Sequence, residues 1–340
     1  MTDKSFELTP ETVQEYLAAE GLVPRGEPCK ARELGGGVSN IVLLIEWPQT
    51  PARRWVVKQS LEKLRVKDDW RSERSRIFRE AQAIRLLRPL VANALPEVIH
   101  VDREKYLYVM TASPPGSLVW KDSLLAGHRP SPQTASQAGT LLATMINGSR
   151  APELREHLEE EFRDRTVFDQ LRIDPYYRTA AARHPDVASA LAQLIQDSWQ
   201  IRTSIVHGDY SPKNILVTRG EIFLIDFEVV HWGDPAFDAA FLLNHLLLKA
   251  FHQPRFLPMY VEDIREFWKA LSAGLGPERV SDFEGMTLRH LGGLMLARID
   301  GKSPVEYIRD EGTRERVRSV AKHTILQRLC LEEVVKLTAL

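Results

Sequence analysis

The spacing of hydrophobic residues changes near residue 112, and this change constrains the fold of the 340-residue chain more than any other feature. Before it, glycine- and proline-containing turns separate short aliphatic runs that are typical of strands, at 30–34, 41–45, 54–58 and 98–111. After it, apolar residues recur at helical spacing, as in Ala138, Leu141, Leu142 and Met145. We therefore predict an α+β chain of two domains, 1–112 with an antiparallel sheet and a helix, and 113–340, mostly helical.

Composition excludes several classes of protein. Lys plus Arg total 45 and Asp plus Glu total 46, a net charge of −1, so we expect no nucleic-acid partner. The most apolar stretch, 237–251, is too short for a membrane span and is interrupted by polar residues, so we expect a buried helix and no membrane partner. Cys29 and Cys330 lack metal-ligand spacing, and residues 1–7 lack the apolar core of a secretory signal, so we expect a cytoplasmic protein.

Two helix starts are indicated in the second domain. Asp234 is a suitable N-cap for the helix of 237–251, with Pro235 at its first position. The sequence Ser303-Pro304-Val305-Glu306 has the pattern of a capping box, which predicts that the last long helix begins there.

The densest group of chemically active residues is His207-Gly208-Asp209-Tyr210-Ser211-Pro212-Lys213-Asn214. Its Gly and Pro indicate a shaped loop, which leads into a hairpin whose aliphatic strands are joined by Thr218-Arg219-Gly220-Glu221. The hairpin should return Asp226 close to Asn214. Carboxylate and carboxamide oxygens are ligands that Mg²⁺ prefers, with phosphate oxygens and water in its remaining positions. Asp209 can accept a proton from an incoming hydroxyl.

A charged pair is predicted in the first domain. An apolar helical stripe is formed by Ile77, Ala81 and Ile84. Glu80 lies within this stripe, so its carboxylate points toward the core and needs a cation as partner. Lys58, at the end of an apolar strand, is the natural candidate. Glu73, two turns earlier on nearly the same face, is the rival for the role of Glu80.

A glycine hairpin precedes the second strand and comprises Gly35, Gly36, Gly37 and Ser39. A dinucleotide fingerprint is excluded, because it needs a third Gly where Asn40 stands and a helix where a strand follows. What remains is a turn whose backbone N–H groups could cover phosphates, with glycines that allow close approach.

The pattern His-x-Asp-x₄-Asn followed by Ile-Asp-x-Glu resembles the catalytic and metal loops of the aminoglycoside phosphotransferase and choline kinase group, which shares the protein-kinase-like fold. The form His207-Gly208-Asp209, and Glu228 in place of a Gly after Asp226-Phe227, favour the small-molecule branch. The resemblance follows the order of glycine hairpin, Lys strand, Glu helix, hinge, catalytic loop and metal loop, and it weakens after about residue 250.

This resemblance implies a bilobal kinase that uses ATP and Mg²⁺ to phosphorylate a hydroxyl of a small molecule, such as a sugar, an amino alcohol or an aminoglycoside-like compound. It makes Asp209 the catalytic base and Asn214 and Asp226 the metal ligands. The acceptor, the choice between ATP and GTP, and the oligomeric state are not determined by the sequence.

The resemblance also implies roles for residues around these groups. The glycine hairpin and Lys58, oriented by Glu80, would cover the ATP phosphates, and the backbone from Met110 to Ala112 would contact adenine. Asp238 would brace the catalytic loop, so its replacement by Ala should lower kcat.

Three further residues have supporting roles. His207 is expected to be a buried scaffold residue of the loop. Lys213 either touches the γ-phosphate or is solvated, and Glu228 either reaches a metal-bound water or faces the substrate.

Two alternatives remain at this stage. A protein kinase is disfavoured by Glu228 and by the short segment 227–235, which leaves little room for an activation segment. A nucleotide-binding interaction module without turnover is disfavoured by the intact set of Asp209, Asn214, Asp226 and Lys58.

Overall fold

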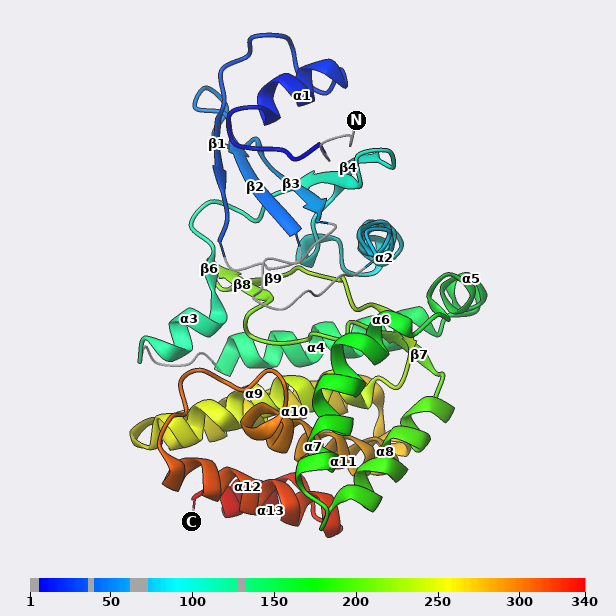
Figure 1. Cartoon of the computed structure of the whole chain (residues 1–340), viewed down its shortest axis with the longest axis vertical. Helices are drawn as coiled ribbons and strands as arrows, with labels where there is room; N and C mark the ends of the chain where they lie inside the picture. Colours follow the sequence, from blue (N-terminus) through cyan, green and yellow to red (C-terminus); the bar gives the residue numbers. More distant parts are fainter. Residues whose placement is uncertain (1–5, 36–39, 62–72, 128–131, 340) are drawn as a thin grey trace. The chain divides into compact units, whose positions relative to one another are not determined.

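The computed structural model describes residues 6–35, 40–61, 73–127 and 132–339. The chain divides into two compact units, Met1–Ser117 and Leu118–Leu340, the first built around a sheet and the second mainly of helices (Figure 1). The sequence placed the boundary at residue 112. The structure places it later because the residues after Ser117 form strand β6 (Leu118–Val119), which pairs with β8 (Ile215–Thr218) of the second unit.

The first unit contains one antiparallel sheet in the order β1-β2-β3-β5-β4. Its strands are β1 (Lys30–Glu33), β2 (Asn40–Glu46), β3 (Arg54–Ser60), β4 (Val98–Asp102) and β5 (Leu107–Thr111). Its helices are α1 (Val13–Ala19), α2 (Arg76–Val91) and the short 3₁₀ helix η1 (Ala92–Ala94). The four strand regions and the helix that the hydrophobic pattern predicted are therefore present.

Strand alternation determines which residues of this sheet face each helix. Val57 belongs to the core cluster that the sheet forms with α1, together with Leu43 and Val13. Successive side chains of a strand point to opposite faces, so Lys58 faces the other way. On that side its ammonium meets the carboxylate of Glu80 on α2.

The second unit is mostly helical, with two small sheets. Its helices are α3 (Trp120–Leu125), α4 (Pro132–Ser149), α5 (Pro152–Phe162), α6 (Thr166–Phe168), the π-helix η2 (Asp169–Arg178), α7 (Thr179–Arg183), α8 (Ala188–Gln200), α9 (Ala236–His252), η3 (Pro254–Phe256), α10 (Leu257–Leu275), α11 (Pro277–Asp300), α12 (Glu311–Leu326) and α13 (Leu331–Ala339). Its strands are β6, β7 (Ser204–Val206), β8, β9 (Glu221–Leu224) and β10 (His231–Gly233), in the orders β6-β8-β9 and β10-β7.

Helix α9, yellow in Figure 1, forms the centre of this unit. It contacts α10, α11, α12 and α13, and almost all of its residues are buried, including the charged Asp238 and Lys249. The expectation of a buried helix at 237–251 is therefore met. Within the part of the chain that the structure describes, no helix combines the length and the apolar character needed to cross a membrane.

Of the two predicted helix starts, one is nearly right and one is wrong. The Asp234 carboxylate accepts the N–H of Ala236 at 3.0 Å, so it caps α9 one position earlier than the helix bounds suggest. The last helices do not begin at Ser303: α12 begins at Glu311, and Asp310 is its N-cap, accepting the N–H of Thr313 at 2.8 Å. Residues after Gly301 instead fold back on α11, where the Val305 N–H donates to the Arg298 carbonyl at 2.9 Å.

Helices α4 and α10 approach each other closely at small residues. A Cβ built on Gly139 of α4 would meet the Phe267 carbonyl and lie 2.9 Å from the Leu271 nitrogen, both on α10. A Cβ on Gly274 of α10 would lie 2.5 Å from the Cβ of Ala143. Backbone atoms cannot turn aside as a flexible side chain can, so these glycines set the helix separation.

We predict that Gly139→Ala destabilises the protein by about 1–3 kcal/mol, because the added methyl group forces α4 and α10 apart. Gly285→Ala is the matched control: Gly285 is an exposed position within α11 where a Cβ meets no atom within 4 Å. There, alanine should leave stability unchanged or raise it by up to about 1 kcal/mol. Thermal unfolding followed by circular dichroism compares the two, and equal melting temperatures would contradict the close packing.

Candidate active site

The hairpin of β8 and β9 places two of the predicted metal ligands side by side. Ile215 pairs with Leu224, and the Ile225 N–H donates to the Asn214 carbonyl at 3.0 Å, so Ile225 lies opposite Asn214 and Asp226 is the next residue. Asp226 has a φ of 73°, a left-handed conformation that is unusual for a residue other than glycine. Such strained positions concentrate at functional sites.

Asp238, on the first turn of α9, holds the loop that precedes the hairpin. Its carboxylate is fully buried and accepts the backbone N–H of His207 at 2.6 Å and that of Gly208 at 2.9 Å. Burial raises the pKa of Asp238 to about 7, although the two N–H donors act in the opposite direction. Gly208 has a φ of 78°, and a Cβ there would lie 2.7 Å from the Val229 carbonyl, so the loop requires glycine at this point.

His207 is fully buried inside the same loop. Its Nδ1 accepts the Asp209 N–H at 3.1 Å, so the proton lies on Nε2, which donates to the Ile225 carbonyl at 3.1 Å. The ring therefore connects the loop to the end of β9. Burial lowers the pKa of His207 to about 4, so it is neutral at physiological pH.

Arg172 is a residue of the site that sequence reasoning missed. It lies on the π-helix η2, and helices of this type are rare and often mark functional sites. Its Nε donates to the Gly208 carbonyl at 2.7 Å, and its Nη2 lies 3.3 Å from the Asp209 carboxylate. Both Arg172 and Asp209 are at least nine-tenths buried, so this cation fixes the orientation of the carboxylate. The segment Asp169–Arg178 mixes charged residues with aliphatic and aromatic ones, so nothing in the sequence singles out Arg172 or indicates its partner.

Three acidic residues, Asp209, Asp226 and Glu228, each act to raise the pKa of the same two cations, Lys213 and Arg172. All three acids therefore lie near these cations. Asp209 raises the pKa of Lys213, and Asp226 and Glu228 add to this. Burial works to lower the pKa of Arg172, but Asp209, Glu228 and Asp226 help to raise it overall. The acids at 209, 226 and 228 therefore form one negative group with two cations beside it.

The donor set of this group suits a hard divalent cation. The buried Asn214 donates from Nδ2 to the Asp209 carbonyl at 3.0 Å, which leaves its amide oxygen as the atom that a cation would contact. Together with the Asp226 carboxylate, this supplies oxygen ligands of the kind that Mg²⁺ binds, with no sulfur or imidazole among them.

In the first unit, the expected ion pair between Lys58 and Glu80 is present. The Lys58 ammonium lies 2.8 and 2.7 Å from the two carboxylate oxygens, and both side chains are buried. Glu73 is exposed and precedes the first residue of α2, so it is not the partner of Lys58.

The structure describes only some of the other residues that the sequence predicts to contact the nucleotide. Met110 lies in β5, between β3 and β4. The N–H of Ala112 already donates to the Arg54 carbonyl at 2.9 Å, so only the carbonyl of Ala112 could contact an adenine. Gly35 follows β1, whereas Gly36, Gly37 and Ser39 lie outside the described residues.

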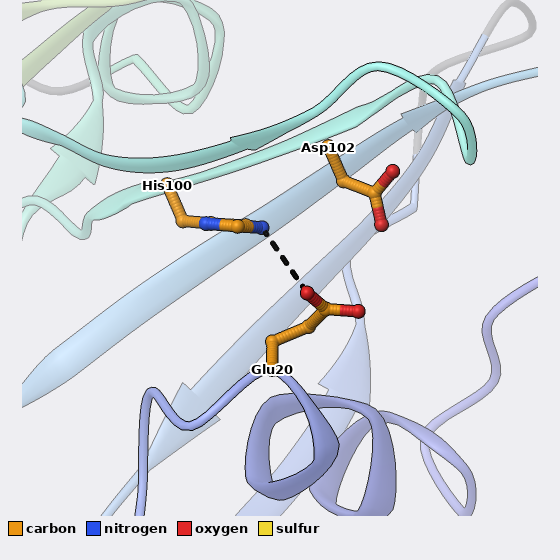
Figure 2. Close-up of side chains that lie close together, drawn as sticks. All are labelled: Glu20, His100 and Asp102. Atoms are coloured by element: carbon orange, nitrogen blue, oxygen red, sulfur yellow. Dashed lines mark ion pairs between the residues drawn. The ribbon is translucent and has the colours of Figure 1, made fainter.

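A second group of metal-type ligands lies in the first unit, where the side chains of Glu20, His100 and Asp102 converge (Figure 2). Their ligand atoms lie within 4.8 Å of one another. The Lys105 ammonium, however, binds Glu20 at 3.0 Å and Asp102 at 2.8 Å, and the Tyr16 hydroxyl donates to Asp102 at 3.0 Å. The ammonium thus provides the positive charge that a metal would bring, and we assign no metal to this group.

Residues 30–275 match the model of the phosphotransferase enzyme family. The chain belongs to this family. The matched segment includes the glycine hairpin, the Lys58–Glu80 pair and the whole acidic group around Asp209.

Among curated relatives of this phosphotransferase family member are methylthioribose kinases. Methylthioribose kinase 2 of Oryza sativa subsp. japonica is 26% identical over 247 residues, which cover 65% of this chain and 57% of that protein. The methylthioribose kinase of Escherichia coli O45:K1 is 26% identical over 279 residues, 73% of this chain and 65% of that protein. The chain thus spans less than two thirds of the length of these relatives.

Solved structures show the same fold. An ethanolamine kinase of Plasmodium vivax superposes with a TM-score of 0.56 and 12% identity, covering 99% of this chain and 90% of that one. The gentamicin complex of APH(2")-IIa superposes with a TM-score of 0.53 and 15% identity, covering 98% and 100%. The fold is therefore protein-kinase-like, as expected, with an antiparallel sheet in the first unit and a mostly helical second unit.

We predict that His207 remains in the neutral Nε2–H form at about pH 5.5, where a free imidazole of pKa about 6.5 is mostly charged. The unfolded chain binds this proton below about 6.5 and the folded one only below about 4, so His207 lowers the free energy of unfolding as the pH falls through this window. Nitrogen NMR of the imidazoles, with His207→Gln for assignment, checks the prediction. A charged His207 ring at this pH would contradict the buried hydrogen-bonded geometry.

Proposed function

We propose that the chain is an ATP- and Mg²⁺-dependent kinase that transfers the γ-phosphoryl group to a hydroxyl of a small molecule, with Asp209 as the catalytic base. One observation carries this proposal. Asp209 is oriented by Arg172 on a loop that Asp238 holds through two backbone N–H groups, and the hairpin returns the chain so that Asp226 follows Ile225, the residue opposite Asn214. The candidate base and the two candidate oxygen ligands for a metal therefore belong to one unit, which supports the proposal.

The reaction then follows from these positions. The acceptor oxygen forms a bond to the γ-phosphorus while the bond from that phosphorus to the β–γ bridging oxygen breaks. ADP leaves with the electron pair of the broken bond, and the hydroxyl proton passes to the Asp209 carboxylate. Asp209 mainly aligns the oxygen, since phosphoryl transfer depends on positioning and charge neutralisation more than on proton removal.

The nucleotide contacts are proposed as follows. Asn214 and Asp226 would hold Mg²⁺, which when bound neutralises charge on the nucleotide phosphates. Lys58, fixed by Glu80, would bind phosphate oxygens, and the glycine hairpin would cover them. Lys213, whose pKa the acids raise, stays protonated and would offer its charge to the γ-phosphate.

The comparisons support a small hydroxylated acceptor. The curated relatives carry the name methylthioribose kinase, and methylthioribose is therefore the first acceptor to test. The names of the similar structures, an ethanolamine kinase and a gentamicin complex, also point to small molecules with hydroxyl groups.

A protein kinase remains the alternative enzyme, and one feature disfavours it. Between Asp226 and α9 the chain forms only a turn and β10, which pairs with β7. An activation segment able to bind a peptide has no room there. A nucleotide-binding module without turnover is the other alternative. Consumption of ATP when acceptors are added distinguishes a kinase from such a module.

We predict that Asp209→Asn lowers kcat at least about 100-fold, because the base is lost, while the dissociation constant for MgATP changes little. Asp186→Asn is the control, since Asp186 is an exposed carboxylate paired with Lys322. ADP release with methylthioribose, sugars and amino alcohols gives kcat, and calorimetry with a non-hydrolysable ATP analogue gives affinity. Full turnover by Asp209→Asn would refute the assignment of the base.

A further inference from the structure

A fully buried lysine lies on α9 without an acidic partner. The Lys249 side chain is 0% exposed, and its ammonium donates to the carbonyl of His245, one turn earlier in the same helix, at 3.1 Å. Within residues 6–35, 40–61, 73–127 and 132–339, no carboxylate forms an ion pair with it. Burial of a charge without a counter-charge is costly, so such a residue calls for an explanation.

Cations predominate around Lys249, with the acid Glu306 beside them. Burial, together with Lys121 and Arg298, lowers the pKa of Lys249 to about 7, whereas Glu306 acts in the other direction. The pKa of His245 is likewise lowered by burial and then by Lys249, Arg298, Lys121 and Lys213. Cations from α3, α9, α11 and the loop before β8 therefore gather around one place.

Two further donors at this place have no hydrogen-bond partner among the described residues. One is the buried Tyr307 hydroxyl, and the Lys249 ammonium lies 5.6 Å from the centre of the Tyr307 ring. The Nε of Arg298 is also buried without a partner, although its Nη1 binds the Ser303 carbonyl and hydroxyl. These cations and donors together form a group of Lys121, Lys249, Arg298 and Tyr307, which we call the cation cluster.

The cation cluster is continuous with the group around Asp209. The Arg298 guanidinium lies 5.8 Å from the ring centre of Tyr176, and that ring stacks on Phe241 at 6.3 Å. Arg172, which contacts Asp209, lies 5.7 and 5.5 Å from the centres of the same two rings. In addition, the Lys121 N–H donates to the carbonyl of Pro212 in the Asp209 loop at 2.9 Å.

We propose that the acceptor carries an anionic group, a carboxylate or a phosphate, in addition to the hydroxyl that is phosphorylated, and that the cation cluster binds this group. Arg298 and Lys121, which are half-buried, contact the anion, and the buried Lys249 and Tyr307 supply charge and a donor behind them. The Tyr176 and Phe241 rings separate this end from Asp209, so the anion and the reacting hydroxyl lie at opposite ends of one acceptor. This inference rests on the proposed phosphoryl transfer at Asp209.

Matched acceptors test the proposal. Ribitol, ribonate and ribose 5-phosphate offer similar hydroxyl groups with no charge, a carboxylate or a phosphate, and glycerol, glycerate and glycerol 3-phosphate form a second set. We expect at least one anionic member to have a KM about 10- to 100-fold lower than its neutral counterpart, the range expected for hydrogen bonds to a charged group. The carboxylate and phosphate arms show which anion the cluster prefers.

Variants connect this preference to the residues. Arg298→Gln should raise the KM for the preferred anionic acceptor about tenfold or more relative to the KM for its neutral counterpart, and Arg298→Lys should partly restore that ratio. Lys269→Gln, which removes an exposed cation of α10 paired with Glu266, should change none of these values.

Lys249→Met separates a binding role from a structural one. Removal of an uncompensated buried charge should raise the melting temperature, and it should also raise the KM for the anionic acceptor. A lower melting temperature with unchanged KM would assign Lys249 to the fold alone.

The outcomes for the two proposals are distinct. If transfer occurs but every neutral and anionic pair has equal KM, or Arg298→Gln affects both alike, the anionic acceptor is refuted and the kinase remains. If no acceptor is phosphorylated, the proposed function fails. Anion binding by the cation cluster is then tested by the shift in melting temperature with ribonate and with ribose 5-phosphate. A shift in the wild type that Arg298→Gln abolishes supports an anion site there, and no shift refutes it.

Discussion

The second unit depends on one buried carboxylate. Asp238 accepts hydrogen bonds from two successive backbone N–H groups, those of His207 and Gly208. These bonds fix a loop that lies outside helices and strands and so lacks their hydrogen bonds. With the loop fixed, His207 can connect it to Ile225, and Arg172 can reach both the Gly208 carbonyl and Asp209. A buried carboxylate with no other partner would be costly, so the loop and α9 stabilise each other.

Part of the geometry of the candidate site could be predicted because it follows from local spacing. A hairpin of short strands must return to its start, which places Asp226 one residue after Ile225, the residue opposite Asn214, and a helical stripe with one Glu in it implied a buried partner such as Lys58. Patterns of this kind depend only on backbone periods of two and 3.6 residues. The fold followed from the same patterns together with the family resemblance.

The rest depends on contacts between segments that are distant in sequence. Arg172 reaches the loop from a π-helix, and neither this helix type nor its register has a signal in residue spacing. The pattern at Ser303–Glu306 satisfies the local rule for a capping box, but the chain there bonds back to Arg298, and Asp310 caps the helix instead. The unpaired state of Lys249 is likewise visible only once α3 and α11 are in place.

The charges of the second unit are divided along its length. Acids gather at Asp209, Asp226 and Glu228, where a metal and phosphates would be bound, and cations gather at Lys121, Lys249 and Arg298, beyond the rings of Tyr176 and Phe241. In our proposal, the first group serves the nucleotide end of a phosphoryl transfer, and the second selects the acceptor. The chain's net charge of −1 hides this separation.

The central claim is that Asn214 and Asp226 bind the metal that accompanies the nucleotide. The most direct measurement is the amount of Mn²⁺, used in place of Mg²⁺, that the protein retains with a non-hydrolysable ATP analogue, counted by electron paramagnetic resonance. We expect stoichiometric Mn²⁺ in the wild type and its loss in a folded Asp226→Asn variant. Equal Mn²⁺ retention by the two proteins would contradict it.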